Sequence, residues 1–122
     1  MEENKVTAVF GSSTKQMRYS NKAINKLRQY GHSVVALGLR EGVIADVEIQ
    51  TGQPELEGIH TISMYLGLQN QPEYYDYIRA LKPKRVIFNP GTENSEFANL
   101  LRNDQIEVVE YCTLVMLDSA MY

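Results

Sequence analysis

The sequence has no pattern of a disulfide-rich, zinc-binding or membrane-spanning protein. It has one cysteine, Cys112, so no disulfide can form within the chain, and no neighbouring residues complete a zinc site. No run approaches the roughly 20 apolar residues of a membrane-spanning helix. The first residues, MEENK, are polar and acidic, unlike a secretory signal or a transit peptide. We therefore expect one cytoplasmic domain over residues 1–122, away from membranes, with Cys112 as a buried structural thiol.

A basic face and a catalytic set are also missing. The formal net charge is −3 and the pI is near 5.4, whereas nucleic-acid binding normally needs a basic surface. Neither histidine, His32 or His60, has a serine, a cysteine or a pair of carboxylates at a spacing that would indicate a catalytic set. We expect no nucleic-acid partner, no metal and no catalytic residue.

Strand and helix patterns alternate along the chain without a linker or a repeat. The expected strands are residues 6–10, 33–38, 47–50, 60–66, 85–89 and 106–109, with 47–50 as a short edge strand. One helix should begin with Ser20 as its N-cap and end at Gly31, a second should run from Pro72 to Lys82, and a third should carry Phe97, Leu100 and Leu101. A brief helical turn is expected at 54–56, and the tail after Val109 is either a strand or a short helix.

Single helices between successive strands imply parallel pairing through right-handed crossovers. The fold class is therefore α/β, with one doubly wound, mostly parallel sheet and helices on both faces. Tyr74 and Tyr77 share a stripe with Ile78 and Leu81, so we expect them to pack in the core. The binding site should lie at the carboxyl ends of the strands, where the strand order reverses. Three loops fall there: GSSTKQMRYS, YLGLQN and NPGTEN.

The loop GSSTKQMRYS, residues 11–20, has the composition of an anion site. Gly11 permits a sharp turn, Ser12 and Ser13 supply hydroxyl and N–H groups, and Ser20 starts a helix whose positive end attracts phosphate. The loop has neither the G-x-G-x-x-G pattern of dinucleotide sites nor that of a P-loop. A tight turn with an ordinary helix start is the alternative interpretation.

The end of the second expected strand favours a phosphorylated ribose. In nucleotide-binding α/β domains an acidic residue there binds the ribose hydroxyls, whereas an arginine accommodates a ribose phosphate. Here Gly38 is followed by Leu39 and Arg40, and Glu41 comes only afterwards. A solvated surface arginine is the alternative.

These segments together resemble a known family. GSS with RYSNKAINKLRQYGHSVVALG, YLGLQNQPEYYDYI, KPKRVIFNPGTENSEF and CTLVML are similar to the small stand-alone family of CoA-binding, Rossmann-like proteins. They also resemble the CoA-binding amino-terminal part of the succinyl-CoA synthetase alpha subunit. The resemblance covers nearly the whole chain and is strongest in RYSNKA and PKRVIFNPGTEN. It implies coenzyme A, or an acyl-CoA, as the cofactor.

The resemblance also implies which residues bind that cofactor, on four loops. The diphosphate would contact Gly11, Ser12, Ser13 and Ser20, with Arg18 and Tyr19 lining the same loop. The adenosine ribose and its 3′-phosphate would lie near Gly38 and Arg40, where family members often have lysine. Tyr65 and Leu66 would flank the cofactor, and Asn89 and Gly91 would close the opposite wall.

Two functions follow from this interpretation. The first is a CoA- or acyl-CoA-binding module without its own chemistry, which senses the cofactor or serves a partner enzyme. The second is a small NADP- or CoA-dependent enzyme, for which 122 residues leave little beyond the cofactor domain. The resemblance does not extend to the catalytic domain of succinyl-CoA synthetase. The sequence leaves open whether the protein forms a homodimer and whether the ligand is free or acylated CoA.

Overall fold

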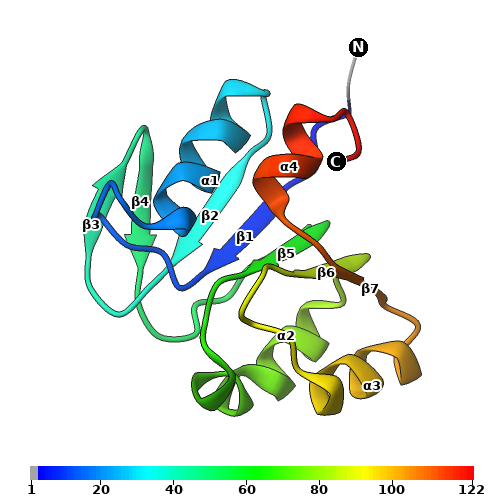
Figure 1. The fold of residues 1–122 in the computed structure, drawn as a ribbon. Coiled ribbons are helices and arrows are strands. Elements are labelled where there is room, and N and C mark those ends of the chain that lie inside the picture. The colour runs from blue at the N-terminus through cyan, green and yellow to red at the C-terminus, as the bar shows by residue number, and fades with distance from the viewer. Residues whose placement is uncertain (1–2) are drawn as a thin grey trace.

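The computed structural model describes residues 3–122, which form one seven-stranded sheet with helices on both faces (Figure 1). The strands are β1 Thr7–Phe10, β2 Val34–Leu37, β3 Gly42–Ile44, β4 Val47–Gln50, β5 Thr61–Met64, β6 Arg85–Phe88 and β7 Glu107–Glu110. Their order across the sheet is β3-β4-β2-β1-β5-β6-β7. All neighbours are parallel except β3 and β4. The expected α/β, doubly wound, Rossmann-like fold is confirmed.

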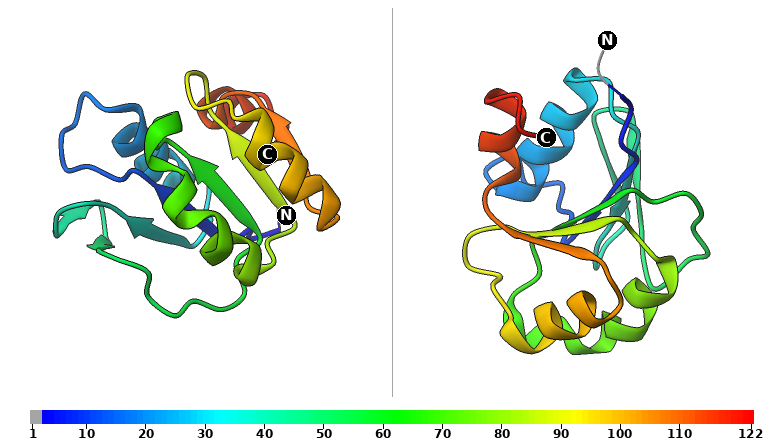
Figure 2. Two further views of the ribbon diagram at one scale, coloured as in Figure 1. Left: turned by 90° about the horizontal axis from the view of Figure 1, so that it is seen from below. Right: turned by 90° about the vertical axis from the view of Figure 1, so that its right-hand side faces the viewer.

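Four α-helices cover the sheet in two pairs. They are α1 Tyr19–Gln29, α2 Tyr75–Leu81, α3 Ser95–Asn103 and α4 Thr113–Asp118, and two 3-10 turns, η1 Leu68–Asn70 and η2 Pro72–Tyr74, precede α2. Figures 1 and 2 show α1 and α4 on one face and α2 and α3 on the other. The tail that the sequence left open between strand and helix is thus the helix α4. No helix in the described residues has the length and apolarity that a membrane crossing requires.

The central strand β1 supplies both hydrophobic cores. Val9 packs with residues of α1 and α4, whereas Ala8 and Phe10 pack with residues of α2 and α3. A parallel strand buried on both faces needs apolar side chains on both, which is why 7–10 is a continuous rather than an alternating run. In register, Phe10 lies beside Leu37 of β2 and Met64 of β5, so these three strands end level with one another.

Helix α1 begins earlier than expected and ends as expected. Its N-cap is Arg18, which is extended and makes no side-chain cap bond, and Ser20 is already helical and buried. The prediction of Ser20 as the N-cap is therefore wrong, because the helix starts one residue before Ser20 and Arg18 occupies the N-cap position. At the other end Gly31 has φ +85°, and the N–H groups of Gly31 and His32 donate to the carbonyls of Arg28 and Leu27. This is the Schellman arrangement that glycine favours.

The segment 39–58 differs most from expectation. β4 has the predicted bounds but is not an edge strand, because β3 pairs antiparallel along its outer side. The hairpin turns at Ala45, whose φ is +55°. Glycine or asparagine usually occupies such a position, so an alanine there gave no sequence signal for the turn. The helical turn expected at 54–56 is absent, since these residues run as an extended loop.

The remaining elements agree with expectation except at Cys112. Pro72 opens the first turn before α2, and Lys82 ends α2 in the left-handed conformation at φ +51°. Tyr74 and Tyr77 pack against Phe10 in edge-to-face contacts, as predicted. Cys112 is the N-cap of α4 and is only half-buried, so the expectation of a buried thiol is wrong.

Candidate functional site

A cleft of about 390 Å³ lies at the carboxyl ends of β1, β2 and β5, which end at the same level in the sheet. The chain leaves β1 for α1 on one face of the sheet and leaves β5 for α2 on the other face, so the two loops part and open a crevice. Its lining residues are Phe10, Gly11, Ser12, Ser13, Thr14, Lys15, Arg18, Leu37, Gly38, Leu39, Arg40, Tyr65, Leu66, Gly67, Asn70 and Tyr74.

The loop after β1 is fixed from inside the protein. The N–H groups of Gly11 and Ser12 both donate to the carbonyl of Leu37, at 3.0 and 2.9 Å. The Ser12 hydroxyl donates to the carbonyl of Val9 at 2.8 Å, so it points into the sheet and not into the cleft. Asn21 of α1 donates from its side chain to the Ser13 carbonyl at 2.9 Å. These bonds hold the loop in place before any ligand arrives.

Two glycines allow the loops of the cleft to touch. Gly11 has φ +87°, and a Cβ there would lie 3.0 Å from the carbonyl carbon of Tyr65. A Cβ at Gly38 would lie only 2.4 Å from the carbonyl oxygen of Ser12. Glycine is favoured at both positions because one backbone approaches another, and these two approaches bring together the three loops that line the cleft.

The cleft carries positive charge on a chain whose formal net charge is negative. Lys15, Arg18 and Arg40 line it and are exposed, and no carboxylate is among the described lining residues. None of the three forms an ion pair with a described residue. Cations left unpaired along a cleft concentrate a positive field there, which favours an anionic ligand.

The loop after β5 forms the opposite wall mainly with backbone. The Tyr65 ring packs with the core beneath α1 and α4, and its buried hydroxyl has no hydrogen-bond partner among the described residues. Burial raises the pKa of the Tyr65 phenol, and to a lesser extent that of Tyr74. Both tyrosines are therefore neutral hydroxyl groups at physiological pH.

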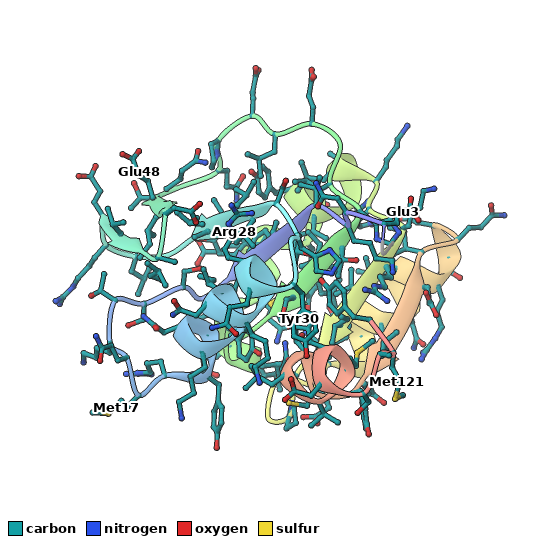
Figure 3. All side chains as sticks on the ribbon, turned by 90° about the horizontal axis from the view of Figure 1, so that it is seen from above. Glu3, Met17, Arg28, Tyr30, Glu48 and Met121 are labelled. Atoms are coloured by element: carbon teal, nitrogen blue, oxygen red, sulfur yellow. The ribbon has the colours of Figure 1, made fainter. Side chains whose placement is uncertain are left out.

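The structure brings most, but not all, of the expected cofactor residues together. Those that line the cleft are Gly11, Ser12, Ser13, Arg18, Gly38, Arg40, Tyr65 and Leu66. Outside its lining lie Tyr19, Ser20, Asn89 and Gly91. The Tyr19 ring is exposed, with the Lys22 ammonium 5.2 Å from its centroid. The neighbouring Met17 also projects outward from this loop (Figure 3).

Asn89 and Gly91 are engaged within the protein. Asn89 is 1% exposed, and its side chain donates to Ser63 and to the Met64 carbonyl and accepts the N–H of Thr113. The Gly91 N–H donates to the Glu93 carboxylate at 2.9 Å. These bonds join the loop after β6 to β5 and to the start of α4.

Several lining residues were not in the expected set: Phe10, Thr14, Lys15, Leu37, Leu39, Gly67, Asn70 and Tyr74. Thr14 and Lys15 lie in the loop that the sequence singled out, and Gly67 and Asn70 lie in the loop YLGLQN. Their loops were therefore predictable, whereas the side chains and backbone groups that face the cleft follow from loop conformation. Tyr74 serves both as a core residue and as part of the cleft.

Among the described residues that line the cleft there is no histidine, cysteine or carboxylate side chain. Within residues 3–122 no three histidine, cysteine or carboxylate side chains are grouped as metal ligands. His32 accepts the N–H of Lys5 through Nδ1, and His60 shares a hydrogen bond with Thr61 at the start of β5. Both histidines thus lie near the amino ends of the strands, opposite the cleft.

Comparison with known proteins gives one family and several structures of the same fold. A family model described as a CoA binding domain matches residues 5–118. A crystal structure described as that of an uncharacterized protein is 40% identical with a TM-score of 0.96, and the match covers 99% of this chain and 100% of the other. No curated protein matches the chain.

More distant structures show the fold alone. A protein from Thermus thermophilus, described as cell-free ID.343, has a TM-score of 0.86 at 19% identity, with 98% of this chain and 91% of the other covered. A hypothetical protein from Pyrococcus horikoshii OT3 has a TM-score of 0.86 at 17% identity, with 98% and 85% covered.

Proposed function

The chain belongs to this CoA-binding domain family, and from that membership we propose that its cleft at the ends of β1, β2 and β5 binds coenzyme A or an acyl-CoA. We propose further that the protein acts as a binding module, without chemistry of its own, that senses the cofactor or serves a partner enzyme.

The distribution of cations in the cleft carries this proposal. Coenzyme A has two separated anionic parts, a diphosphate and a 3′-phosphate on the adenosine ribose. The cleft offers Lys15 and Arg18 on the loop after β1 and Arg40 on the loop after β2, all without an acidic partner among the described residues. We assign the first pair to the diphosphate and Arg40 to the 3′-phosphate, because charge-assisted bonds to phosphate are the strong ones.

The volume of the cleft supports binding of part of the ligand rather than its complete enclosure. Ligand pockets commonly measure about 300–1,000 Å³, and this cleft is at the small end, at about 390 Å³. In the proposal the nucleotide half of CoA occupies the cleft, and the pantetheine arm extends along its mouth. A free thiol and a short acyl thioester would then bind with similar affinity.

Thermal unfolding in the presence of CoA, acetyl-CoA, NAD and NADP tests the proposal directly. A ligand at a hundred times its dissociation constant stabilises the folded protein by about 2.7 kcal/mol. We expect CoA and acetyl-CoA to raise the Tm and NAD to leave it unchanged. A rise with NADP and none with CoA would contradict the proposal.

The alternative function, a small NADP- or CoA-dependent enzyme, needs a proton donor or acceptor at the cleft. The described lining residues include no histidine, cysteine or carboxylate, and the raised pKa values of Tyr65 and Tyr74 make these two phenols poor bases at neutral pH, which favours the binding module. Incubation of the protein with acetyl-CoA, with thiol release followed by a colorimetric reagent, separates the two. Release well above the protein-free rate would favour the enzyme.

A further inference from the structure

Gln71 is a polar side chain that is completely buried beside the cleft without lining it. It lies between η1 and η2 and is 0% exposed. Its Nε2 donates to the carbonyl of Leu66 at 3.0 Å and to the carbonyl of Thr92 at 2.8 Å. Its Oε1 accepts a hydrogen bond from Nδ2 of Asn94 at 2.9 Å. Both N–H groups of the amide are thus used, and each is bonded to a different loop.

Asn94 anchors this arrangement to a helix. Its Oδ1 accepts the N–H of Phe97 at 3.0 Å and caps α3, and its Nδ2 also donates to the Tyr75 hydroxyl at 2.8 Å. Buried networks whose members are all satisfied hold one geometry firmly. Gln71 therefore fastens the loop after β5 to the rigid start of α3.

The bond from Gln71 determines the direction of one peptide group in the cleft wall. The carbonyl of Leu66 points inward to Gln71, and no described peptide bond is cis. In a planar trans peptide the N–H points opposite to the carbonyl, so the Gly67 N–H points away from Gln71. Gly67 lines the cleft, and no described residue accepts its N–H.

We propose that Gln71 is a positioning residue, which holds the Leu66–Gly67 peptide so that the Gly67 N–H donates to an oxygen of the bound cofactor. The inference rests on the proposed binding of CoA. The acceptor is either a diphosphate oxygen or an amide carbonyl of the pantetheine arm, since both accept the same bond. A backbone donor fixed before binding costs little ordering when the ligand arrives.

Gln71→Glu tests this role, with Gln29→Glu as the matched control. Both substitutions add one carboxyl group, but Gln71 is buried, whereas Gln29 is exposed at the end of α1 and does not line the cleft. In Gln71→Glu the ionised side chain has no donor for the Leu66 and Thr92 carbonyls and repels both, so the peptide can turn. We expect CoA to bind Gln71→Glu about tenfold more weakly than Gln29→Glu at pH 8, the loss of one good hydrogen bond.

The pH profile separates positioning from general damage. A buried carboxyl group has a raised pKa, and once protonated it donates one hydrogen bond again. The ratio of the two dissociation constants should therefore fall toward one between pH 8 and pH 5.5. Titration of the ligand phosphates affects both variants and cancels in the ratio. Gln71→Met, which keeps the length of the side chain and loses both donors, should bind weakly with a flat profile.

Two further measurements complete the test. On CoA binding to the wild type, the Gly67 amide proton should shift downfield in the NMR spectrum. Comparison of ADP with CoA identifies the acceptor, because an equal loss for both ligands indicates the diphosphate and a loss for CoA alone indicates the pantetheine arm. If Gln71→Glu does not fold by circular dichroism, Gln71→Met replaces it. An unmoved Gly67 amide, or equal affinities of the Gln71 and Gln29 variants, would overturn the inference. Failure of the wild type to bind CoA would overturn the proposed function as well.

Discussion

Arg40 is the residue whose proposed role can be tested with a pair of ligands. It is exposed, lines the cleft three residues after the end of β2, and forms no ion pair with a described residue. If it contacts the 3′-phosphate, Arg40→Ala should weaken CoA binding by about tenfold, the value of one charge-assisted bond. Dephospho-CoA lacks this phosphate and should bind nearly as before. Calorimetric titration of both proteins with both ligands measures the difference.

Arg102 provides the control for a change of net charge. It is exposed, lies in the last turn of α3 and is not part of the cleft. Arg102→Ala should leave both affinities unchanged. An equal loss for CoA and dephospho-CoA in Arg40→Ala would show that Arg40 does not bind this phosphate. Lys15 and Arg18 would then be the cations to replace.

At the scale of single residues, the sequence located loops better than side chains. The placement of Gly38 beside the cleft was predictable from its position after a strand, but its reason, the nearby Ser12 carbonyl, required the fold. Asn89 was expected at the wall, yet its side chain turns inward and joins β5 to α4. A sequence pattern shows that a loop reaches the site. The hydrogen bonds inside the fold determine which groups face it.

At the scale of elements, the contact between the loops after β1 and β5 should depend on Gly11. Gly11 and Gly31 have nearly equal φ values of +87° and +85°, but a Cβ at Gly11 would lie 3.0 Å from the Tyr65 backbone, whereas a Cβ at Gly31 would meet nothing within 4 Å. Alanine at either position should lower the free energy of unfolding by about 1–2 kcal/mol, because alanine is strained in the left-handed conformation. Gly11→Ala must also push the Tyr65 backbone away, so it should lose more stability and weaken CoA binding.

Urea denaturation and calorimetric titration compare these two glycine variants. Gly31→Ala should keep the affinity of the wild type for CoA, because the end of α1 lies away from the cleft. Equal losses of stability, together with unchanged CoA affinity in Gly11→Ala, would show that the approach of the two loops does not shape the site.

Elements with strong local signals were predictable, and those that depend on partners were not. The runs that became β1, β5 and β6 consist mainly of apolar or β-branched residues and lie between turn residues, and Gly31 ends α1 as glycine usually does. β3 has only three residues and exists through its pairing with β4. α4 has only six residues and packs against α1. The residues of α4 alone do not predict this contact.

At the scale of the whole molecule, the two ends of the sheet have different roles. The cleft is at the carboxyl ends, and Tyr122 closes the amino ends. The Tyr122 ring lies 4.3 Å from the guanidinium carbon of Arg85, which is 8% exposed, and its hydroxyl bonds to Thr7. Lys5 donates to the Tyr122 backbone oxygen at 2.7 Å. The tail therefore shields a buried cation that has no acidic partner among the described residues.

Replacing Tyr122 should reduce stability without affecting the cleft. Tyr122→Phe keeps the ring over Arg85 and loses one hydrogen bond, so we expect a loss of about 1 kcal/mol. Tyr122→Ala also loses the cation–π contact and the buried ring, and we expect about 2–4 kcal/mol. Urea denaturation measures both values. Unchanged stability in Tyr122→Ala would show that the tail does not support the fold, and a weakened CoA affinity would show that the two ends are coupled.

The same end of the sheet should make the stability depend on pH through His60. Burial lowers the pKa of His60, and the cations Arg85, Lys5 and Lys84 lower it further, with a small opposing effect from Glu3. The unfolded chain then binds a proton near pH 6.5 that the folded protein takes up only at lower pH. His60 therefore does not reduce the free energy of unfolding above about pH 6.5. Below that pH the free energy of unfolding falls until the pH reaches the folded pKa of His60.

Urea denaturation at pH 7.5 and pH 5.5 isolates this contribution. The salt bridges with Arg28, Arg79 and Lys26 lower the pKa values of Asp46, Asp104 and Asp118, so these carboxylates are ionised throughout that range. Their contribution disappears only as the pH falls below about 3.9. We expect the wild type to lose stability between the two pH values and His60→Gln to lose less, because glutamine stays neutral. Parallel losses in the two proteins would mean that His60 is protonated as easily in the folded protein as in the unfolded chain.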